Sequence, residues 1–524
     1  MSRQLWNRNV KSELHRTLSL LKRDTVLLEL LSGHPSSRLA VTVAGGGPSL
    51  TYRQLQQQVT SLAEELKRLG IHPGDRIAIA LPNGLEAIVA FLAASTSGTA
   101  APLNPAYKYD EFRFYLADTS ARALIVPANG MVVARQAAAH QTIIIETDID
   151  QDGQVRFRSD AHASTNPRDS QSNSEDIALI LHTSGTTSRP KRVPLAHKNL
   201  LASARNVAKT YALNGDDVAL CVMPLFHVHG LVASTLATLS TGGTVVVAPR
   251  FDALSFWATV KEHDVTWYSA VPTIHQILLA RTRRSERPSG SERLRFIRSC
   301  SAALPAALML ELEDRFAVPV LQAYGMTEAA HQMASNPLSG ERKPGSVGCA
   351  IGLEIAILDN DGQQLSTGQR GEVCIKGANV FSGYEDNPDA NAASFTRGWF
   401  RTGDQGFLDQ DDYLTLLGRI KELINRGGEK ISPQEIDEVL LAHSSVAEAV
   451  CFAVPDRMYG EELAAAVVLN QPESENALIQ HCRSLLADFK CPKEIHIVEA
   501  IPRTATGKVQ RRHVAAAIAA RRKD

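Results

Sequence analysis

Residues 179–200 read LILHTSGTTSRPKRVPLAHKNL, and they indicate a strand that runs directly into a ligand-binding loop. The loop, residues 183–191, is rich in hydroxyl-bearing and small residues and ends in Lys191. Small residues allow backbone N–H groups to approach a ligand, hydroxyls donate to phosphate oxygens, and lysine supplies positive charge. The pattern is typical of a polyphosphate site, although the GxxxxGK[ST] spacing of a Walker A loop is absent. A simple Ser/Thr turn between two elements is the alternative.

Outward from this loop, short β-branched runs alternate with helix-like stretches. This alternation predicts α/β architecture with largely parallel sheets. Residues 51–70 form the clearest helical pattern, with apolar residues at helical spacing, a capping box at Thr51 and Gln54, and a stop at Gly70. The expected strands are 76–81, 123–126, 142–145, 177–181, 244–247, 265–268, 294–298 and 318–321.

The composition is typical of a globular enzyme with several domains. The chain has 524 residues and a formal net charge of −1, and this neutrality argues against a dedicated nucleic-acid or membrane-surface binder. Apolar runs stay well below the roughly 20 residues of a membrane-spanning helix. Seven widely spaced cysteines without a CxxC pair favour reduced thiols over disulfides or a zinc site.

The two ends of the chain bear on its location. The first 24 residues are basic but contain no apolar core or small-residue cleavage site of the secretory kind. The chain ends in ARRKD, which is not an SKL-type peroxisomal address. We therefore expect a cytoplasmic protein, with an organellar transit peptide and peroxisomal association as alternatives.

A change of pattern near Gly418 divides the chain. The region before it is rich in strands and turns, and the region after it opens with new strand and helix signals, including a helix start at Ser432-Pro433. We expect an N-terminal domain at 1–417, a hinge at 418–421 and a C-terminal domain at 422–524. Two polar stretches, 158–175 and 281–293, are expected to be solvated loops.

Five further motifs follow the loop in order: YGMTE at 324–328, GEVCIKGANVFSGY at 371–384, WFRTGD at 399–404, GRIK at 418–421 and PRTATGK at 502–508. Together with TSGTTSRPK they resemble the motifs of the adenylate-forming superfamily of acyl-CoA synthetases, luciferases and peptide-synthetase adenylation domains. The resemblance covers nearly the whole chain. It implies a large N-terminal domain of mainly parallel sheets flanked by helices, and a small mobile α+β C-terminal domain.

The resemblance implies a nucleotide site. Glu328 would hold Mg²⁺ against the phosphates of ATP, and Thr327 would donate to a phosphate oxygen. Tyr324 would face the adenine, Asp404 would accept from the ribose hydroxyls, and Arg419 would approach the α-phosphate. The complete nucleotide-binding set so implied is Thr183, Ser184, Gly185, Thr186, Thr187, Lys191, Ser301, Ala302, Ala303, Ala323, Tyr324, Gly325, Thr327, Asp404, Arg419 and Lys508.

The same resemblance assigns roles near the C-terminus. Lys508 would bridge the carboxylate substrate and the α-phosphate, and it forms the catalytic set together with Glu328 and Thr327. Lys421 occupies the hinge position about which the small domain would turn. The Gly427-Gly428 turn would let the pantetheine of CoA pass close to the backbone. Each of these residues also has a plainer reading, as a solvated side chain or an ordinary turn.

The sequence departs from the family pattern in two places, because Ser188 and Arg192 stand where glycine is common. Serine is a mild change in a phosphate loop. Arg192 lies just past the loop, and with arginine at this position the family pattern does not define the path of the loop backbone.

Three segments are expected to line the acyl pocket: PLFHVHG at 224–230, RSCSAALP at 298–305 and AAHQM at 329–333. They contain His227, Ser301 and His331, which are hydrogen-bond donors suited to a second carboxylate rather than to a hydrocarbon chain. Within the family, the oxalate-activating ligases of plants and fungi are most similar to this chain in the runs PLFHVHG, TWYSAVPTIHQI, RFIRSCSA, GRIKELINRGGEKISP and KVQRR. The resemblance therefore assigns the three residues to an oxalate site.

The prediction is an ATP-dependent acid–CoA ligase that uses Mg²⁺, with ATP, CoA and oxalate or another small carboxylic acid as its partners. A ligase for short or medium fatty acids or for aryl acids is the first alternative. A peptide-synthetase module is disfavoured because no carrier domain follows Lys508, and a non-catalytic descendant of the fold is the last alternative. Monomer and homodimer both remain open, and nothing in the sequence supports a nucleic-acid partner.

Overall fold

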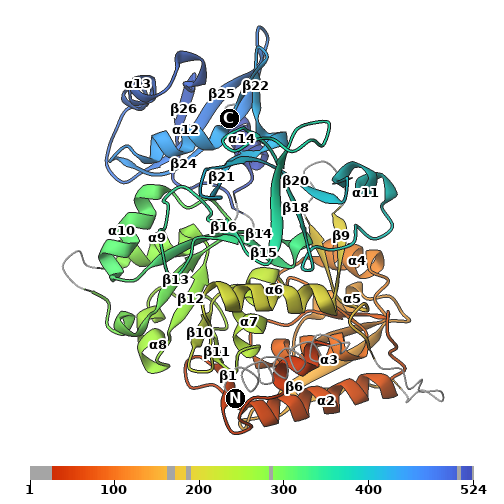
Figure 1. Cartoon of the computed structure of the whole chain (residues 1–524). Coiled ribbons are helices and arrows are strands. Elements are labelled where there is room, and N and C mark those ends of the chain that lie inside the picture. Colours follow the sequence, from red (N-terminus) through yellow and green to blue (C-terminus); the bar gives the residue numbers. More distant parts are fainter. Residues whose placement is uncertain (1–25, 162–171, 184–189, 283–286, 504–508, 522–524) are drawn as a thin grey trace, which may run out of the picture.

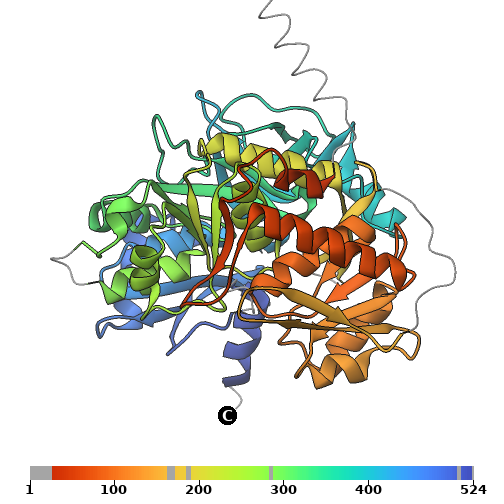
Figure 2. The same ribbon diagram turned by 90° about the horizontal axis from the view of Figure 1, so that it is seen from below.

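The computed structural model describes residues 26–161, 172–183, 190–282, 287–503 and 509–521 (Figure 1). Within these ranges the chain forms a large N-terminal body and a smaller C-terminal body, which lies at the top of Figure 1 in blue. Two sheets with helices on their faces build most of the large body. Figure 2 shows them side by side, one with green helices and one with orange helices.

The first sheet has seven strands in the order β7-β6-β5-β3-β4-β8-β9, and the five inner strands are parallel. Its strands are β3 (Arg76–Ile79), β4 (Thr99–Pro102), β5 (Ala123–Pro127), β6 (Ile143–Ile149), β7 (Val155–Arg158), β8 (Ile177–Thr183) and β9 (Lys191–Ala196). The associated helices are α2 (Tyr52–Arg68), α3 (Leu85–Ser97), α4 (Tyr109–Asp118) and α5 (Val132–Ala137). The predicted helix at 51–70 is confirmed as α2, and Thr51 and Gln54 form its capping box.

The second sheet has nine strands in the order β16-β15-β14-β13-β12-β10-β11-β1-β2. Its strands are β1 (Leu39–Val43), β2 (Ser49–Thr51), β10 (Val218–Cys221), β11 (Thr244–Val247), β12 (Trp267–Ala270), β13 (Phe296–Ser299), β14 (Val320–Met326), β15 (His331–Ser335) and β16 (Cys349–Ala350). The run from β1 to β14 is parallel, and β2, β15 and β16 add antiparallel edges. Around it lie α6 (His197–Thr210), η2 (His229–Leu236), α7 (Ala237–Leu239), α8 (Phe256–Glu262), α9 (Pro272–Arg281) and α10 (Ala306–Phe316).

A third, antiparallel sheet completes the large body and leads to the small one. It comprises β17 (Leu353–Leu358), β18 (Gly371–Gly377), β19 (Phe395–Thr396), β20 (Trp399–Leu408) and β21 (Leu414–Arg419), with α11 (Pro388–Ser394) beside it. Gly418 and Arg419, expected in the hinge, form the end of β21, and residues 420–422 form the single turn η5 (Ile420–Glu422).

The C-terminal body has its own sheet and its own apolar clusters on both faces of that sheet. Its elements are β22 (Ile424–Arg426), β23 (Glu429–Ile431), α12 (Pro433–Leu441), β24 (Val446–Asp456), β25 (Gly460–Leu469), α13 (Glu475–Leu485), β26 (Glu494–Ile497) and α14 (Arg511–Arg521). The helix start predicted at Ser432-Pro433 is confirmed by α12. The predicted fold class, parallel sheets with a small α+β domain, is thus confirmed, whereas the domain limits stay a prediction.

Among the described helices, not one combines the length and the apolar character that crossing a bilayer requires.

Candidate active site

The predicted motifs gather at the carboxyl ends of adjacent parallel strands. Ser301 follows β13, and Thr327 and Glu328 follow β14 in the short turn η4 (Thr327–Ala329). Figure 1 shows β14 and β15 beneath the C-terminal body. In open α/β sheets ligands bind at this edge, because loops from neighbouring strands converge there.

Gly325 fixes how β14 and β15 meet. A Cβ atom at this position would lie 2.0 Å from the carbonyl oxygen of His331. No residue other than glycine tolerates so close an approach. The glycine of the YGMTE motif therefore sets the register that brings His331 opposite Met326.

Three residues of the predicted nucleotide set are joined by hydrogen bonds and an ion pair. The Tyr324 hydroxyl donates to Oδ2 of the buried Asp404, and Arg419 Nε lies 2.7 Å from the other carboxylate oxygen, Oδ1. Burial, together with the Asp404 charge, holds the pKa of Tyr324 well above its usual value. The phenol is therefore a permanent donor, and the Asp404 carboxylate is held in one orientation between β14, β20 and the end of β21.

A second group suits a metal-bound polyphosphate. Glu328 is buried, and the Tyr384 hydroxyl donates to its Oε1 at 2.9 Å. Lys191 Nζ lies 4.3 Å from the centroid of the Tyr384 ring. Burial lowers the pKa of Lys191, and the positive charge of Lys421 lowers it further, while burial raises the pKa of Glu328. Lys191 therefore interacts electrostatically with both the hinge lysine and the acid.

The loop that links β8 to β9 is described only at its two ends. Thr183 and Lys191 pair across the antiparallel β8–β9 ladder. Ser184, Gly185, Thr186, Thr187 and Ser188 lie outside the described residues, so their nucleotide role stays a prediction. Among the other predicted residues, Ala302 and Ala303 are exposed in the turn after Ser301, and Ala323 is buried in β14.

The structure gives Arg192 a function that the sequence did not suggest. Arg192 lies at the base of the predicted phosphate loop, where its backbone is opposite His182 in the β8–β9 ladder. Nε lies 2.8 Å from Glu385 Oε2, Nη1 lies 3.4 Å from Asp118 Oδ2, and Nη2 pairs with Asp386. The arginine thus ties the loop base to helix α4 and to the segment that follows Tyr384.

We expect Arg192→Ala to destabilise the protein by about 1–3 kcal/mol, because the partly buried carboxylates of Asp118 and Glu385 each lose one of their partners. A fall in the melting temperature and a rise in KM for ATP would both be measured. Arg156→Ala is a matched control, since Arg156 pairs with Asp150 at a more exposed site. An unchanged melting temperature in Arg192→Ala would show that the guanidinium does not brace the loop.

The three residues predicted to bind the acid meet through a fourth, His229. Its Nδ1 lies 2.9 Å from Ser301 Oγ, and its ring centroid lies 5.2 Å from that of His331. The backbone N–H of His229 donates to His227 Nδ1 at 3.4 Å. His229 begins the π-helical segment η2, a helix type that is frequent at functional sites.

Two residues of this cluster were not assigned from the sequence. In the sequence His229 suggests only half of a metal pair with His227, whereas in the structure its Nε2 lies 2.6 Å from a hydroxyl, Ser269 Oγ. The second is Arg298, which is fully buried. The available signal was a charged residue directly after the apolar pair Phe296-Ile297 in an expected strand.

Backbone strain is concentrated at the same cluster. Ser301 has φ +72°, Ala330 has φ +49° and His331 has φ +117°, all in regions that non-glycine residues rarely occupy. Such conformations persist only where the surrounding structure enforces them, and they occur frequently at binding and catalytic sites.

The C-terminal predictions are only partly described. Lys508 lies outside the described residues. Lys421 is exposed in η5, and Gly427 and Gly428 form the two-residue turn between β22 and β23, with φ +60° and +98°. Two positive φ angles are what a tight hairpin of this kind requires. Their role in binding CoA stays a prediction.

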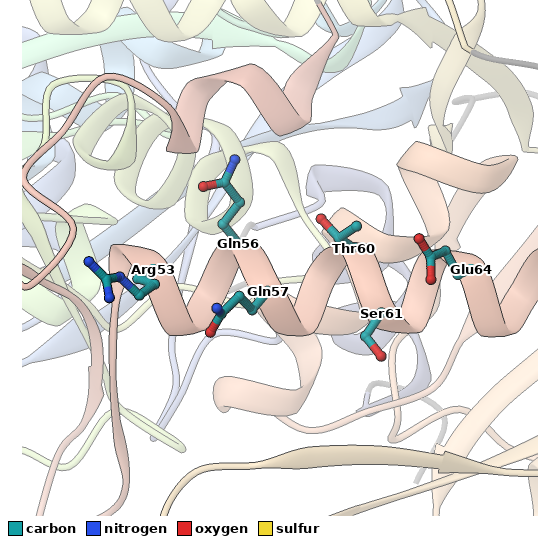
Figure 3. A pocket seen from close by; sticks show the side chains of 6 residues that line it. All are labelled: Arg53, Gln56, Gln57, Thr60, Ser61 and Glu64. Carbon is teal, nitrogen blue, oxygen red and sulfur yellow. The ribbon is translucent and has the colours of Figure 1, made fainter.

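A separate shallow pocket lies along α2 and is lined by Arg53, Gln56, Gln57, Thr60, Ser61 and Glu64 (Figure 3). All six side chains come from one helix face. None of the strand-end motifs contributes to it, so it is not the candidate active site.

The comparisons with known proteins agree with this geometry. The family model described as AMP-binding enzyme matches residues 30–385, and the one described as AMP-binding enzyme C-terminal domain matches residues 435–508. The chain therefore belongs to the AMP-binding enzyme family.

Its relatives refine this class. An oxalate–CoA ligase of Arabidopsis thaliana is 46% identical over 501 residues, which cover 93% of this chain and 97% of the relative. An oxalate–CoA ligase of Saccharomyces cerevisiae is 44% identical over 517 residues, with 92% and 94% covered. The ATP-bound structure of MatB from Rhodopseudomonas palustris matches with a TM-score of 0.84 and 30% identity, over 94% of this chain and 98% of that one. The protein is an ATP-dependent, AMP-forming acid–CoA ligase, as predicted.

Proposed function

We propose that the acid is oxalate and that the reaction converts oxalate, ATP and CoA into oxalyl-CoA, AMP and diphosphate. The observation that carries this proposal is the polar cluster around His229, in which Ser301 and His331 are brought together beside the buried cation Arg298. A hydrocarbon chain gains nothing from such a cluster, whereas a second carboxylate would be costly to bury without it.

The residues around the nucleotide support the first half-reaction. A carboxylate oxygen of oxalate attacks the α-phosphorus, the bond to the β,γ-diphosphate breaks, and oxalyl-AMP forms. Asp404 and Tyr324 would hold the nucleoside, Lys191 would meet the phosphates, and Lys508 would stabilise the charge that develops at the α-phosphate. Glu328, with Thr327, would hold Mg²⁺, which supplies charge neutralisation for the phosphates. Carboxylate oxygens are ligands that Mg²⁺ prefers, and Glu328 is a buried carboxylate beside the loop lysine Lys191.

In the second half-reaction the CoA thiol attacks the oxalyl carbonyl, AMP leaves, and the thioester forms. The Gly427-Gly428 turn would let the pantetheine approach. A rotation of the C-terminal body at the hinge near Lys421 would replace the face that carries Lys508 with the face that carries this turn. No cysteine of the chain takes part in either bond change.

A substrate panel tests the acid. In a diphosphate-release assay with CoA present, we expect kcat/KM for oxalate to exceed that for hexanoate or coumarate by at least about 100-fold, because a site built to hydrogen-bond rejects ligands that lack the group. Faster turnover of hexanoate or coumarate would remove oxalate and favour the fatty-acid or aryl-acid alternative. An absence of acid-dependent AMP formation with every acid would favour a non-catalytic member of the fold.

A further inference from the structure

Arg298 is a fully buried guanidinium at the end of β13, and it lacks a carboxylate partner in the part of the chain that the structure describes. Buried charges in proteins are normally paired. The groups that act on the pKa of Arg298 are the Tyr211 phenol and the Cys300 thiol, and neither is a carboxylate. Burial without an anionic partner is costly, so the arginine requires an explanation beyond packing.

Four hydrogen bonds account for most of its donors. Nε donates to the Tyr211 hydroxyl at 2.8 Å and Nη1 to Ser269 Oγ at 3.0 Å. Nη2 approaches Gln332 Oε1 at 3.2 Å and His331 Nδ1 at 3.4 Å. The guanidinium therefore links β12, β13 and β15 directly below the predicted acid site.

These contacts have a fixed direction, because a guanidinium can only donate. His331 Nδ1 must accept from Arg298, so in the neutral ring the proton lies on Nε2. Ser269 Oγ also accepts from Arg298, and its own hydrogen then points to His229 Nε2 at 2.6 Å. The His229 proton is accordingly on Nδ1, from which it donates to Ser301 Oγ.

The opposite direction of the hydrogen bond between His229 and Ser269 is unfavourable. If His229 donated to Ser269, the hydroxyl hydrogen of this fully buried serine would find no acceptor among the described residues. An unsatisfied buried donor is strongly disfavoured. In the favoured direction Ser301 accepts from His229 and keeps its own hydrogen for a ligand.

We propose that Arg298 is a positioning residue that fixes this hydrogen-bond relay, so that Ser301 Oγ–H is presented as a donor to the distal carboxylate of the acid. A carboxylate only accepts hydrogen bonds, whereas a serine hydroxyl can either donate or accept. Fixing Ser301 as a donor favours a dianion over an acid with a neutral far end. The inference rests on the proposed function, because it concerns the same acid site.

The first test reads the proton positions directly and needs no substrate. In protein labelled with ¹⁵N-histidine, or in a neutron structure, we expect His229 to carry its proton on Nδ1 and His331 on Nε2. Arg298→Lys and Ser269→Ala should each shift the His229 signals toward the other tautomer or a mixture. A wild-type His331 protonated on Nδ1 alone, or a His229 protonated on Nε2 alone, would overturn the proposal whatever the substrate.

The second test is kinetic and uses the acid that performs best in the substrate panel. For oxalate we expect Arg298→Lys and Ser269→Ala to raise KM by about 10- to 100-fold, with KM for ATP changed less than about twofold. The second variant keeps the arginine, so it preserves the test if Arg298→Lys fails to fold. Arg295→Lys is the matched control, because Arg295 lies three residues away and pairs with Asp217 outside the cluster.

An unchanged KM for the acid in both variants would overturn the positioning role. Equal losses with acid and with ATP would also contradict it, since they would indicate a general structural defect. If oxalate fails as a substrate but the tautomers are as expected, the proposed function is wrong and the relay stands.

Discussion

Lys508→Ala should lower the rate of oxalyl-AMP formation by about 10²- to 10³-fold and leave thioester formation from preformed acyl-adenylate nearly intact. The reason is that removal of one group placed against developing charge costs about that much. The cation is needed at the α-phosphate in the first half-reaction, where the bond to diphosphate breaks, whereas in the second the bonds change at the oxalyl carbonyl. Acid-dependent ATP–diphosphate exchange measures the first step, and CoA-dependent release of AMP from synthetic oxalyl-AMP measures the second.

Lys493→Ala is the matched control for this variant. Lys493 lies in the same C-terminal body with its side chain mostly exposed, 3.7 Å from Asp456. It should retain both half-reactions. Equal loss of both steps in Lys508→Ala would contradict the assigned role, because the lysine would then serve the whole cycle or the fold.

Glu328→Gln should reduce adenylation by at least about 10²-fold while it makes the unliganded protein more stable. Glutamine keeps an oxygen for the Tyr384 hydroxyl but cannot supply the charge that Mg²⁺ requires. The buried carboxylate is disfavoured by its surroundings, so its neutral analogue should raise stability by about 1 kcal/mol. The rate of ATP–diphosphate exchange at several Mg²⁺ concentrations measures the effect on adenylation. The melting temperature without ligand measures the effect on stability.

The gain in stability has a defined pH dependence. Burial raises the pKa of Glu328 above its ordinary value of 4.5. An acid whose pKa is raised on folding makes the protein less stable as pH rises from the ordinary value through the raised one. The melting temperatures of wild type and Glu328→Gln should therefore converge near pH 4 and separate toward neutral pH.

Glu372→Gln should change the stability in the opposite direction to Glu328→Gln, because Glu372 forms a largely buried ion pair with Arg401 at 2.7 Å. Removal of its charge should lower the melting temperature at neutral pH. A wild type that is more stable than Glu328→Gln at pH 7 would show that Glu328 is satisfied in the free enzyme and would weaken its assignment to Mg²⁺.

The parts of this fold that the sequence predicted are those with local patterns. Residues 51–70 carry a helical apolar repeat and a cap, and residues 244–247 carry a short β-branched run, and both form the expected elements as α2 and β11. The strand predicted at 265–268 begins two residues later in the structure, at Trp267. Strand ends depend on pairing with neighbours, which local patterns do not contain.

The site was less predictable where long-range contacts decide it. Single polar residues in pocket segments pointed to Ser301 and His331, but nothing local connects them to Ser269, a buried serine on another strand. Likewise, Arg192 appeared only as a departure from glycine, because its carboxylate partners lie more than 70 residues away in both directions. Such clusters exist only after the chain has folded.

Ion pairs within the C-terminal body hold both ends of the segment that contains Lys508. Arg511, at the start of α14, pairs with Asp437 of α12 at 2.6 Å and with Glu422 of η5 at 3.3 Å. On the other side of the segment that holds Lys508, Arg503 pairs with Glu448 at 2.6 Å. Both ends of this segment are therefore held by ion pairs within the C-terminal body. If that body turns at η5 as predicted, we expect the two ends to move with it as one unit.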